Sequence, residues 1–168
     1  QGLREVLEHY HVPLLGGDTI GGAGSQVLGL TALGRATHRP VPARSGARAG
    51  DELYLTGPVG AAMMGFEALQ TGGGDSAAYR RPAPLLATGQ ALAPLVTAMM
   101  DVSDGLLLDA ARMAEASGVT FALDRMAVPI AAPEQRRDDA LRWGDDYQLL
   151  FCVPAGPRGY ASCSRPSG

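Results

Sequence analysis

The sequence contains no lysine and no asparagine, and all 14 of its basic residues other than histidine are arginine. These absences exclude two common ways of handling ATP. A phosphate-binding loop of the Gly-x-x-x-x-Gly-Lys-Ser/Thr type needs its lysine on the β and γ phosphates. A protein-kinase site needs a strand lysine and a catalytic-loop asparagine. An ATP-dependent enzyme of this composition would have to rely on carboxylates and metal ions.

Strong charge and long apolar runs are missing as well. The net charge is −3 over 168 residues and no basic run occurs, so nucleic acid is not an expected partner. No apolar run reaches the length of a membrane span and no signal segment opens the chain, so we expect a cytoplasmic protein without a membrane partner. Cys152 and Cys163 have neither zinc-site spacing nor a disulfide framework, and Cys152 is expected to be a buried strand residue.

The sequence does carry enough apolar material for a packed core, because 46% of its residues are hydrophobic. Short strand-like and helix-like patterns alternate, which indicates a mixed α/β or α+β fold of layers. Strands are predicted at 12–15, 25–33, 52–56, 95–100, 119–123 and 148–153, and helices at 2–10, 61–70, 85–92, 106–117 and 133–141. The segment 79–84 is predicted to be extended.

A polar, proline-containing connection at 34–42 is a candidate domain boundary. We therefore expect residues 1–40 to be the end of one domain and residues 41–154 to form a second. Residues 155–168 are rich in Gly, Pro, Ser and Arg without periodicity, and are expected to form a disordered tail. Since the chain starts at Gln1, in what reads as the last turns of a helix, it is expected to be a fragment.

The stretch Asp101-Val102-Ser103-Asp104-Gly105 lies between a predicted strand and a predicted helix. Carboxylates on such a turn can bind Mg²⁺, which prefers oxygen ligands, and the start of the helix can face an anion. These are the parts of a metal–phosphate site. Ser103 or Asp104 could instead simply cap the helix, as Ser and Asp often do.

Two further acidic turns lie next to predicted strands, at Gly16-Gly17-Asp18-Thr19 and at Gly144-Asp145-Asp146-Tyr147. Asp18 is either a turn residue or a carboxylate of a metal or phosphate site. Between the first and second acidic turns stands Arg44-Ser45-Gly46-Ala47, where Arg44 could bind two phosphate oxygens or be an ordinary exposed arginine.

In this order, the three acidic turns and the arginine segment resemble the thiamine-monophosphate kinase family. That family belongs to the superfamily of aminoimidazole ribonucleotide synthetase, selenophosphate synthetase and the hydrogenase maturation factor HypE. The resemblance runs from about Gly2 to Val153, and its specific part is the Asp-x-Ser-Asp-Gly element together with Gly-Asp-Asp-Tyr-x-Leu. It implies the end of an N-terminal ATP-binding domain followed by the superfamily's C-terminal α/β domain.

The resemblance also implies a reaction, in which the γ-phosphoryl of Mg-bound ATP passes directly to thiamine monophosphate and gives thiamine diphosphate. The full-length protein would be a homodimer. Phosphoryl transfer depends mainly on positioning and charge neutralisation, so carboxylates and an arginine suit it. The residues carried over by motif are Gly17, Arg44 and Ser103 for ATP, Asp18, Asp101 and Asp104 for Mg²⁺, and Asp145 for the thiamine phosphate.

This sequence departs from the family pattern in two places. The element that usually reads Gly-Gly-Glu-Asp-Tyr-Glu-Leu begins here with Trp143, and Asp145 replaces the longer glutamate. Residues 155–168 do not resemble the closing part of the family, including its aromatic substrate contact. Two alternatives remain: another ATP-dependent enzyme of the superfamily, which the Gly-Asp-Asp-Tyr element argues against, and an inactive fragment with an exposed apolar strand edge at 27–33.

Overall fold

The computed structural model describes residues 2–155 and 163–164, with side chains up to residue 155. The chain divides into two units, Gln1–Gly34 and Arg35–Gly168, which are described separately. The first contains α1 (Gly2–His9). The second contains β1 (Glu52–Leu55), α2 (Ala61–Thr71), α3 (Ala77–Arg80), α4 (Leu86–Leu92), β2 (Ala98–Asp101), α5 (Leu106–Ser117), β3 (Thr120–Phe121), the 3-10 helix η1 (Glu134–Arg136), α6 (Arg137–Arg142), β4 (Leu149–Val153) and β5 (Cys163–Ser164).

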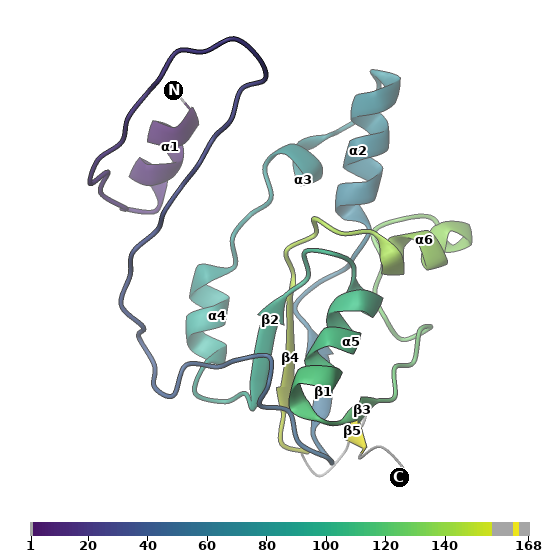
Figure 1. The fold of residues 1–168 in the computed structure, drawn as a ribbon. Helices are drawn as coiled ribbons and strands as arrows, with labels where there is room; N and C mark the ends of the chain where they lie inside the picture. The colour runs from purple at the N-terminus through teal and green to yellow at the C-terminus, as the bar shows by residue number, and fades with distance from the viewer. Residues whose placement is uncertain (1, 156–162, 165–168) are drawn as a thin grey trace. The chain divides into compact units, whose positions relative to one another are not determined.

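The second unit is built on a three-stranded antiparallel sheet in the order β1-β4-β2 (Figure 1). The central strand β4 is strictly alternating, with Leu150 and Cys152 buried and their neighbours only partly buried. This alternation follows from the pleat, which sends successive side chains to opposite faces. The expectation that Cys152 is a buried strand residue is confirmed, since none of its surface is exposed.

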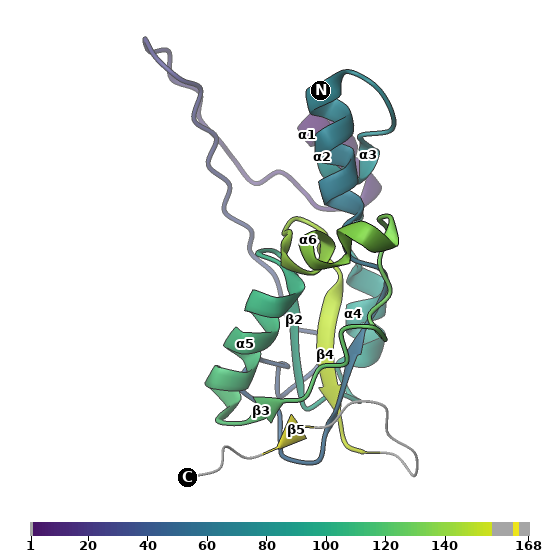
Figure 2. The same ribbon diagram turned by 90° about the vertical axis from the view of Figure 1, so that its right-hand side faces the viewer.

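Helix α5 covers one face of this sheet (Figures 1 and 2). Leu106, Ala110 and Met113 recur at helical spacing and are buried in the same cluster as the inward residues of β4. The helix ends at Gly118, whose left-handed backbone (φ 65°) lets its N–H bind the carbonyls of Ala114 and Glu115. Helix α4 lies against the other face, where its Gly89 packs on the side chain of Leu149.

Helices α2 and α6 lie at the end of the sheet where β2 ends and β4 begins (Figure 1). Phe66 of α2 packs against Trp143, with ring centroids 5.3 Å apart. Arg136 connects helices α2 and α6, since it pairs with Glu67 of α2 at 2.8 Å and with Asp139 of α6 at 2.5 Å. This end of the sheet is therefore closed by helices, which positions the loops that connect to them.

The predicted mixed α/β class is confirmed, but several predicted elements are wrong. Residues 11–33 are all exposed and contain no strand, so neither 12–15 nor 25–33 forms one. A strand needs a partner for its backbone groups, and no described residue supplies one there. The segment 79–84 is not wholly extended, because α3 includes Tyr79 and Arg80.

Other differences concern length. The strand predicted at 119–123 shrinks to Thr120–Phe121, and that at 95–100 begins later and includes Asp101. In the predicted tail, Cys163–Ser164 forms a strand paired with β3. The rest of the tail beyond Ala155 lies outside the described residues.

Candidate functional site

The ends of two neighbouring strands bring two of the acidic turns together. β2 and β4 are antiparallel, with Asp101 opposite Leu149, so the chain leaves β2 where it enters β4. The ladder continues beyond the strands: Val102 N–H donates to the carbonyl of Gln148 and Tyr147 N–H to that of Val102, both at 2.8 Å. One residue further, Asp145 N–H donates to the carbonyl of Ser103 at 2.9 Å. The two turns thus form one hydrogen-bonded edge.

Two glycines permit this close approach. A β-carbon on Gly144 would lie 2.3 Å from the carbonyl oxygen of Ser103, and one on Gly105 would lie 2.3 Å from that of Arg142. Gly105 also has φ 104°, in the region that favours glycine. A larger residue at either position would push the turns apart.

Tyr147 lies within the influence of three carboxylates of the joined turns. Tyr147 Oη donates to Asp145 Oδ1 at 3.2 Å. Partial burial raises the pKa of Tyr147, and the negative charges of Asp145, Asp101 and Asp104 raise it further. Asp145 and Tyr147 both adopt left-handed backbone, with φ 63° and 51°. Non-glycine residues rarely do so, and such strain gathers at functional sites.

The alternative in which Ser103 or Asp104 caps the helix through its side chain is wrong. Gly105 occupies the N-cap position of α5, without a side-chain cap. The exposed Asp104 carboxylate instead forms an ion pair with Arg112. The N–H groups of Ser103 and Asp104 donate to Oδ2 of Asp109, each at 2.9 Å. The role of Ser103 in binding ATP stays a prediction.

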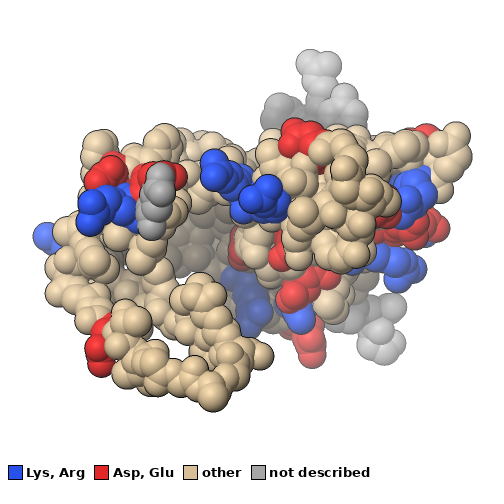
Figure 3. Space-filling model, turned by 90° about the horizontal axis from the view of Figure 1, so that it is seen from above, with Lys and Arg blue, Asp and Glu red and all other residues tan. Residues whose placement is uncertain are grey.

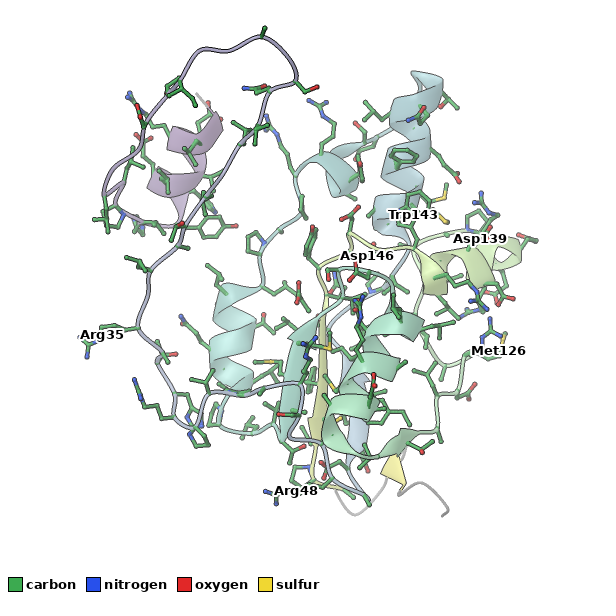
Figure 4. All side chains as sticks on the ribbon, viewed as in Figure 1. Arg35, Arg48, Met126, Asp139, Trp143 and Asp146 are labelled. Atoms are coloured by element: carbon green, nitrogen blue, oxygen red, sulfur yellow. The ribbon has the colours of Figure 1, made fainter. Side chains whose placement is uncertain are left out.

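The second aspartate of the Asp145–Asp146 pair has a structural task. Its two carboxylate oxygens accept the N–H groups of Gly60 at 2.6 Å and Ala62 at 2.9 Å, at the start of α2 (Figure 4). Burial raises the pKa of Asp146, and these hydrogen bonds oppose the rise. Asp146 thus satisfies the first N–H groups of α2 from a distant turn, while Asp145 remains available to a ligand.

Arg44 is not placed beside the acidic turns. Its carbonyl accepts from Ser117 Oγ at 2.9 Å, at the last residue of α5, whereas Ser103 precedes the first. A helix of this length spans about 18 Å. In Figure 4, Arg48 and Asp146 likewise lie at opposite ends of the sheet. Arg44 itself is exposed, so a ligand that touched both Arg44 and Ser103 would have to extend along the sheet.

Gly17 and Asp18 belong to the first unit, where both are exposed. Asp18 Oδ1 accepts the N–H of Thr19 at 2.7 Å, a local bond of the kind that Asp makes in turns. Their roles in binding ATP and metal stay predictions.

The carboxylate turns have the right chemistry for a hard cation, although no cluster is preformed. Asp101 is exposed at the end of β2 and Asp145 is half-buried beside it in the joined turns, so both can offer oxygen ligands. Asp104 would first have to exchange Arg112 for the cation. Among the described residues, no group of three or more His, Cys, Asp or Glu side chains converges on one point. A cation held here would therefore share its coordination with ligand oxygens or water.

A cavity of about 580 Å³ opens next to Asp101 and Tyr147. Its walls are mostly apolar and come from Leu149, from α4 and from the segments 36–42 and 82–86. A ligand in this cavity would have apolar surface on most sides and a carboxylate at one edge.

Charged side chains of both signs lie on the described surface. On the face drawn in Figure 3, the described Arg side chains are interspersed with Asp and Glu and form no continuous basic surface. The longest described helix, α5, has 12 residues, and no described helix is long and apolar enough to cross a membrane.

The fold and the joined turns define a class. The chain belongs to the family described as AIR synthase related protein, C-terminal domain, whose sequence model matches residues 48–161. Its particular relatives are thiamine-monophosphate kinases. It is 37% identical over 175 residues to that of Salmonella typhimurium, covering 92% of this chain and 52% of the relative. It is 35% identical over 176 residues to the thiamine-monophosphate kinase of Escherichia coli K12, covering 94% of this chain and 53% of the relative. The chain thus spans about half the length of the curated relatives it matches.

Solved structures agree with this placement. The thiamine-monophosphate kinase of Stenotrophomonas maltophilia matches with a TM-score of 0.67 at 26% identity, over 76% of this chain and 51% of that one. AaThiL, solved in complex with AMPPCP and TMP, matches with a TM-score of 0.64 at 26% identity, over 76% of this chain and 49% of that one. HypE of E. coli shares the fold alone. Its TM-score is 0.61 at 21% identity, over 76% of this chain and 48% of that one.

The structure adds two residues that the sequence patterns did not single out, Asp109 and Arg112. Asp109 had a detectable signal, because it is a charged residue within the stripe of Leu106, Ala110 and Met113 that the helical period buries. Arg112 stands three residues after Asp109, at the spacing of an i,i+3 pair on a helix, whereas its contact with Asp104 was visible only in the structure.

Proposed function

We propose that this chain is the C-terminal half of a thiamine-monophosphate kinase, which transfers the γ-phosphoryl of ATP to thiamine monophosphate in an Mg²⁺-dependent reaction. The observation that carries the proposal is the hydrogen-bonded edge between the Asp101–Gly105 and Gly144–Tyr147 turns. It brings the proposed metal ligands Asp101 and Asp104 to the same place as Asp145, the proposed substrate contact. The relatives named above support the choice of reaction.

Each residue has a stated task in this proposal. Asp101 and Asp104 would hold Mg²⁺, which neutralises phosphate charge and orients the reacting oxygens. The backbone N–H and carbonyl of Ser103 are already engaged by Asp109 and Asp145. Its hydroxyl is therefore the group that would donate to a phosphate oxygen. Arg44 would contact the far part of the nucleotide. Gly17 and Asp18 would contribute a nucleotide contact and a further metal ligand.

The cavity beside Asp101 and Tyr147 suits the organic part of the substrate. Thiamine monophosphate carries a positively charged aromatic ring, which favours apolar walls next to an aromatic side chain and a carboxylate. The phosphate end would then point toward the acidic edge, where the metal is required to balance the charge. A cytoplasmic location and a homodimeric full-length protein belong to the same proposal.

The test is an assay of the full-length protein that contains this chain, with ATP and thiamine monophosphate as substrates and thiamine diphosphate measured by chromatography. Product should form with Mg²⁺ and disappear with excess chelator. Asp101→Asn should lower the rate by at least about tenfold, a typical cost for losing a metal ligand or its support. Asp138→Asn, an exposed carboxylate on α6, is the control that should keep activity. Absence of Mg²⁺-dependent product would sink the proposal.

The 168 residues alone are expected to be inactive, because part of the metal ligand set is expected outside them. Calorimetry with Mg²⁺ and AMPPCP measures whether the isolated chain binds the nucleotide, and we expect no tight binding. Tight binding by the isolated chain would mean that the described acidic edge suffices for the nucleotide.

A further inference from the structure

We propose that Asp109 is the positioning residue that fixes the Asp101–Gly105 turn for its ligands, with Arg112 as its charge partner. The functional part of this inference rests on the proposed Mg–ATP site. Asp109 itself lies behind the turn and touches no ligand. It acts through the backbone of Ser103 and Asp104.

The first observation is burial. Asp109 is fully buried, with 0% of its surface exposed, in the first turn of α5. Burying a carboxylate is costly unless it is fully hydrogen-bonded and paired. An apolar residue would pack here at lower cost, so the carboxylate must provide something that an apolar residue cannot.

The second observation is what the carboxylate binds. Oδ2 accepts the N–H groups of Ser103 and Asp104 at 2.9 Å each, and Oδ1 accepts from Arg112 at 3.0 Å. Hydrogen bonds to a charged acceptor are stronger than neutral ones. The turn's amides are thus held from behind by Asp109, while its Ser103 carbonyl is held from the side by Asp145. The backbone at Ser103 and Asp104 is thus held at three polar groups.

Arg112 completes the arrangement, since its guanidinium pairs with Asp104 and Asp109 together. If a cation takes the Asp104 carboxylate, Arg112 keeps its partner in Asp109 and need not be left with an uncompensated charge. Asp109 therefore makes the exchange at Asp104 possible and keeps the turn in place while it happens.

Three variants test the proposal. Asp109→Ala removes the acceptor, Asp109→Asn keeps an oxygen without the charge, and Glu115→Gln makes the same acid-to-amide change at an exposed position of the same helix. One readout is amide hydrogen exchange by NMR in the 168-residue chain. The other is KM for ATP and kcat, measured in the full-length protein.

In Asp109→Ala, exchange at Ser103 and Asp104 should rise about tenfold or more, the size expected from losing a bond to a charged acceptor. Amides of the β4 ladder should stay protected. The KM for ATP in Asp109→Ala should also rise about tenfold. Asp109→Asn should give a KM between those of the wild type and Asp109→Ala, and Glu115→Gln should keep the wild-type KM. A merely structural role would instead lower the amount of active enzyme and leave KM unchanged.

Two results would overturn the proposal: unchanged exchange at Ser103 and Asp104, or an unchanged KM in Asp109→Asn and Asp109→Ala. If Asp109→Ala does not fold, Asp109→Asn decides by the same two readouts. If the wild-type protein shows no Mg²⁺-dependent product, the proposed function fails and with it the functional part. The exchange pattern still decides separately whether Asp109 holds the turn.

Discussion

Replacing Gly144 with alanine should separate the two acidic turns. The added β-carbon would lie 2.3 Å from the Ser103 carbonyl oxygen and 3.1 Å from Cα of Asp104. The first distance is roughly 1 Å shorter than a carbon–oxygen contact of about 3.3 Å. Both neighbours are backbone atoms, so no flexible side chain can move aside. The turns must shift, and the bond from Asp145 N–H to the Ser103 carbonyl is the first to be lost.

The magnitude follows from two contributions. Losing one hydrogen bond costs about 1 kcal/mol, and overpacking a tight contact costs about 1–3 kcal/mol. The free energy of unfolding should therefore fall by about 2–4 kcal/mol, a large part of the 5–15 kcal/mol typical of a domain. Gly144 does not have positive φ, so the change measures the steric contact and not a backbone preference.

Urea denaturation with linear extrapolation measures this loss. Gly73→Ala is the matched control, because Gly73 has nothing within 4 Å of the new β-carbon and no positive φ. Its unfolding free energy should change by no more than about 0.5 kcal/mol. Equal midpoints for the two variants would refute the claim that the turns are in tight contact. In the full-length protein, Gly144→Ala should also lower kcat/KM, since Asp145 and Ser103 move apart.

Four further predictions concern residues around this edge and Arg44. Asp146→Ala should lower the free energy of unfolding by about 2 kcal/mol, because two N–H groups of α2 lose a charged acceptor; unchanged urea midpoints would contradict it. Burial raises the folded-state pKa of Asp146, so the stability gained by holding this proton more tightly in the folded state is present below the unfolded pKa of about 3.9 and is lost as pH rises through the folded value, while the hydrogen bonds to Gly60 and Ala62 remain. Wild type should therefore lose stability relative to Asp146→Asn across that window, and parallel pH profiles would show that the pKa is unshifted. Thr56→Val should cost about 1–2 kcal/mol in thermal or urea unfolding, since Thr56 Oγ1 donates to Gln148 Oε1 at 2.9 Å and accepts Leu149 N–H at 2.8 Å. Arg44→Gln should weaken binding of Mg-AMPPCP to the full-length protein without changing the urea midpoint, and equal affinity would remove Arg44 from the nucleotide site.

Local patterns predicted the strand–turn–helix unit around Asp101 well. An apolar run followed by Asp, Ser and Gly and then by helical spacing contains all the information that this unit needs. The failure at 25–33 has the same basis. Its residues are mostly apolar, as in many strands, but a strand also needs a partner, and a local pattern carries no information about one.

The meeting of the two acidic turns could not be derived from spacing. It depends on the pairing of β2 with β4, two segments far apart in the sequence. Only the resemblance to a family suggested that the turns belong together. The division of labour between Asp145 and Asp146 was equally hidden, since which of them caps α2 depends on a backbone with positive φ at Asp145.

The joined turns concentrate negative charge. Asp101, Asp104 and Asp145 all add to the negative field at Tyr147, yet Arg112 neutralises only Asp104 and Asp109. Like charges this close repel, so the arrangement has to be held by other forces. The β2–β4 ladder, the Asp109 acceptor and the glycine contacts supply them. In the proposed Mg–ATP site, a divalent cation would relieve the repulsion that these contacts oppose.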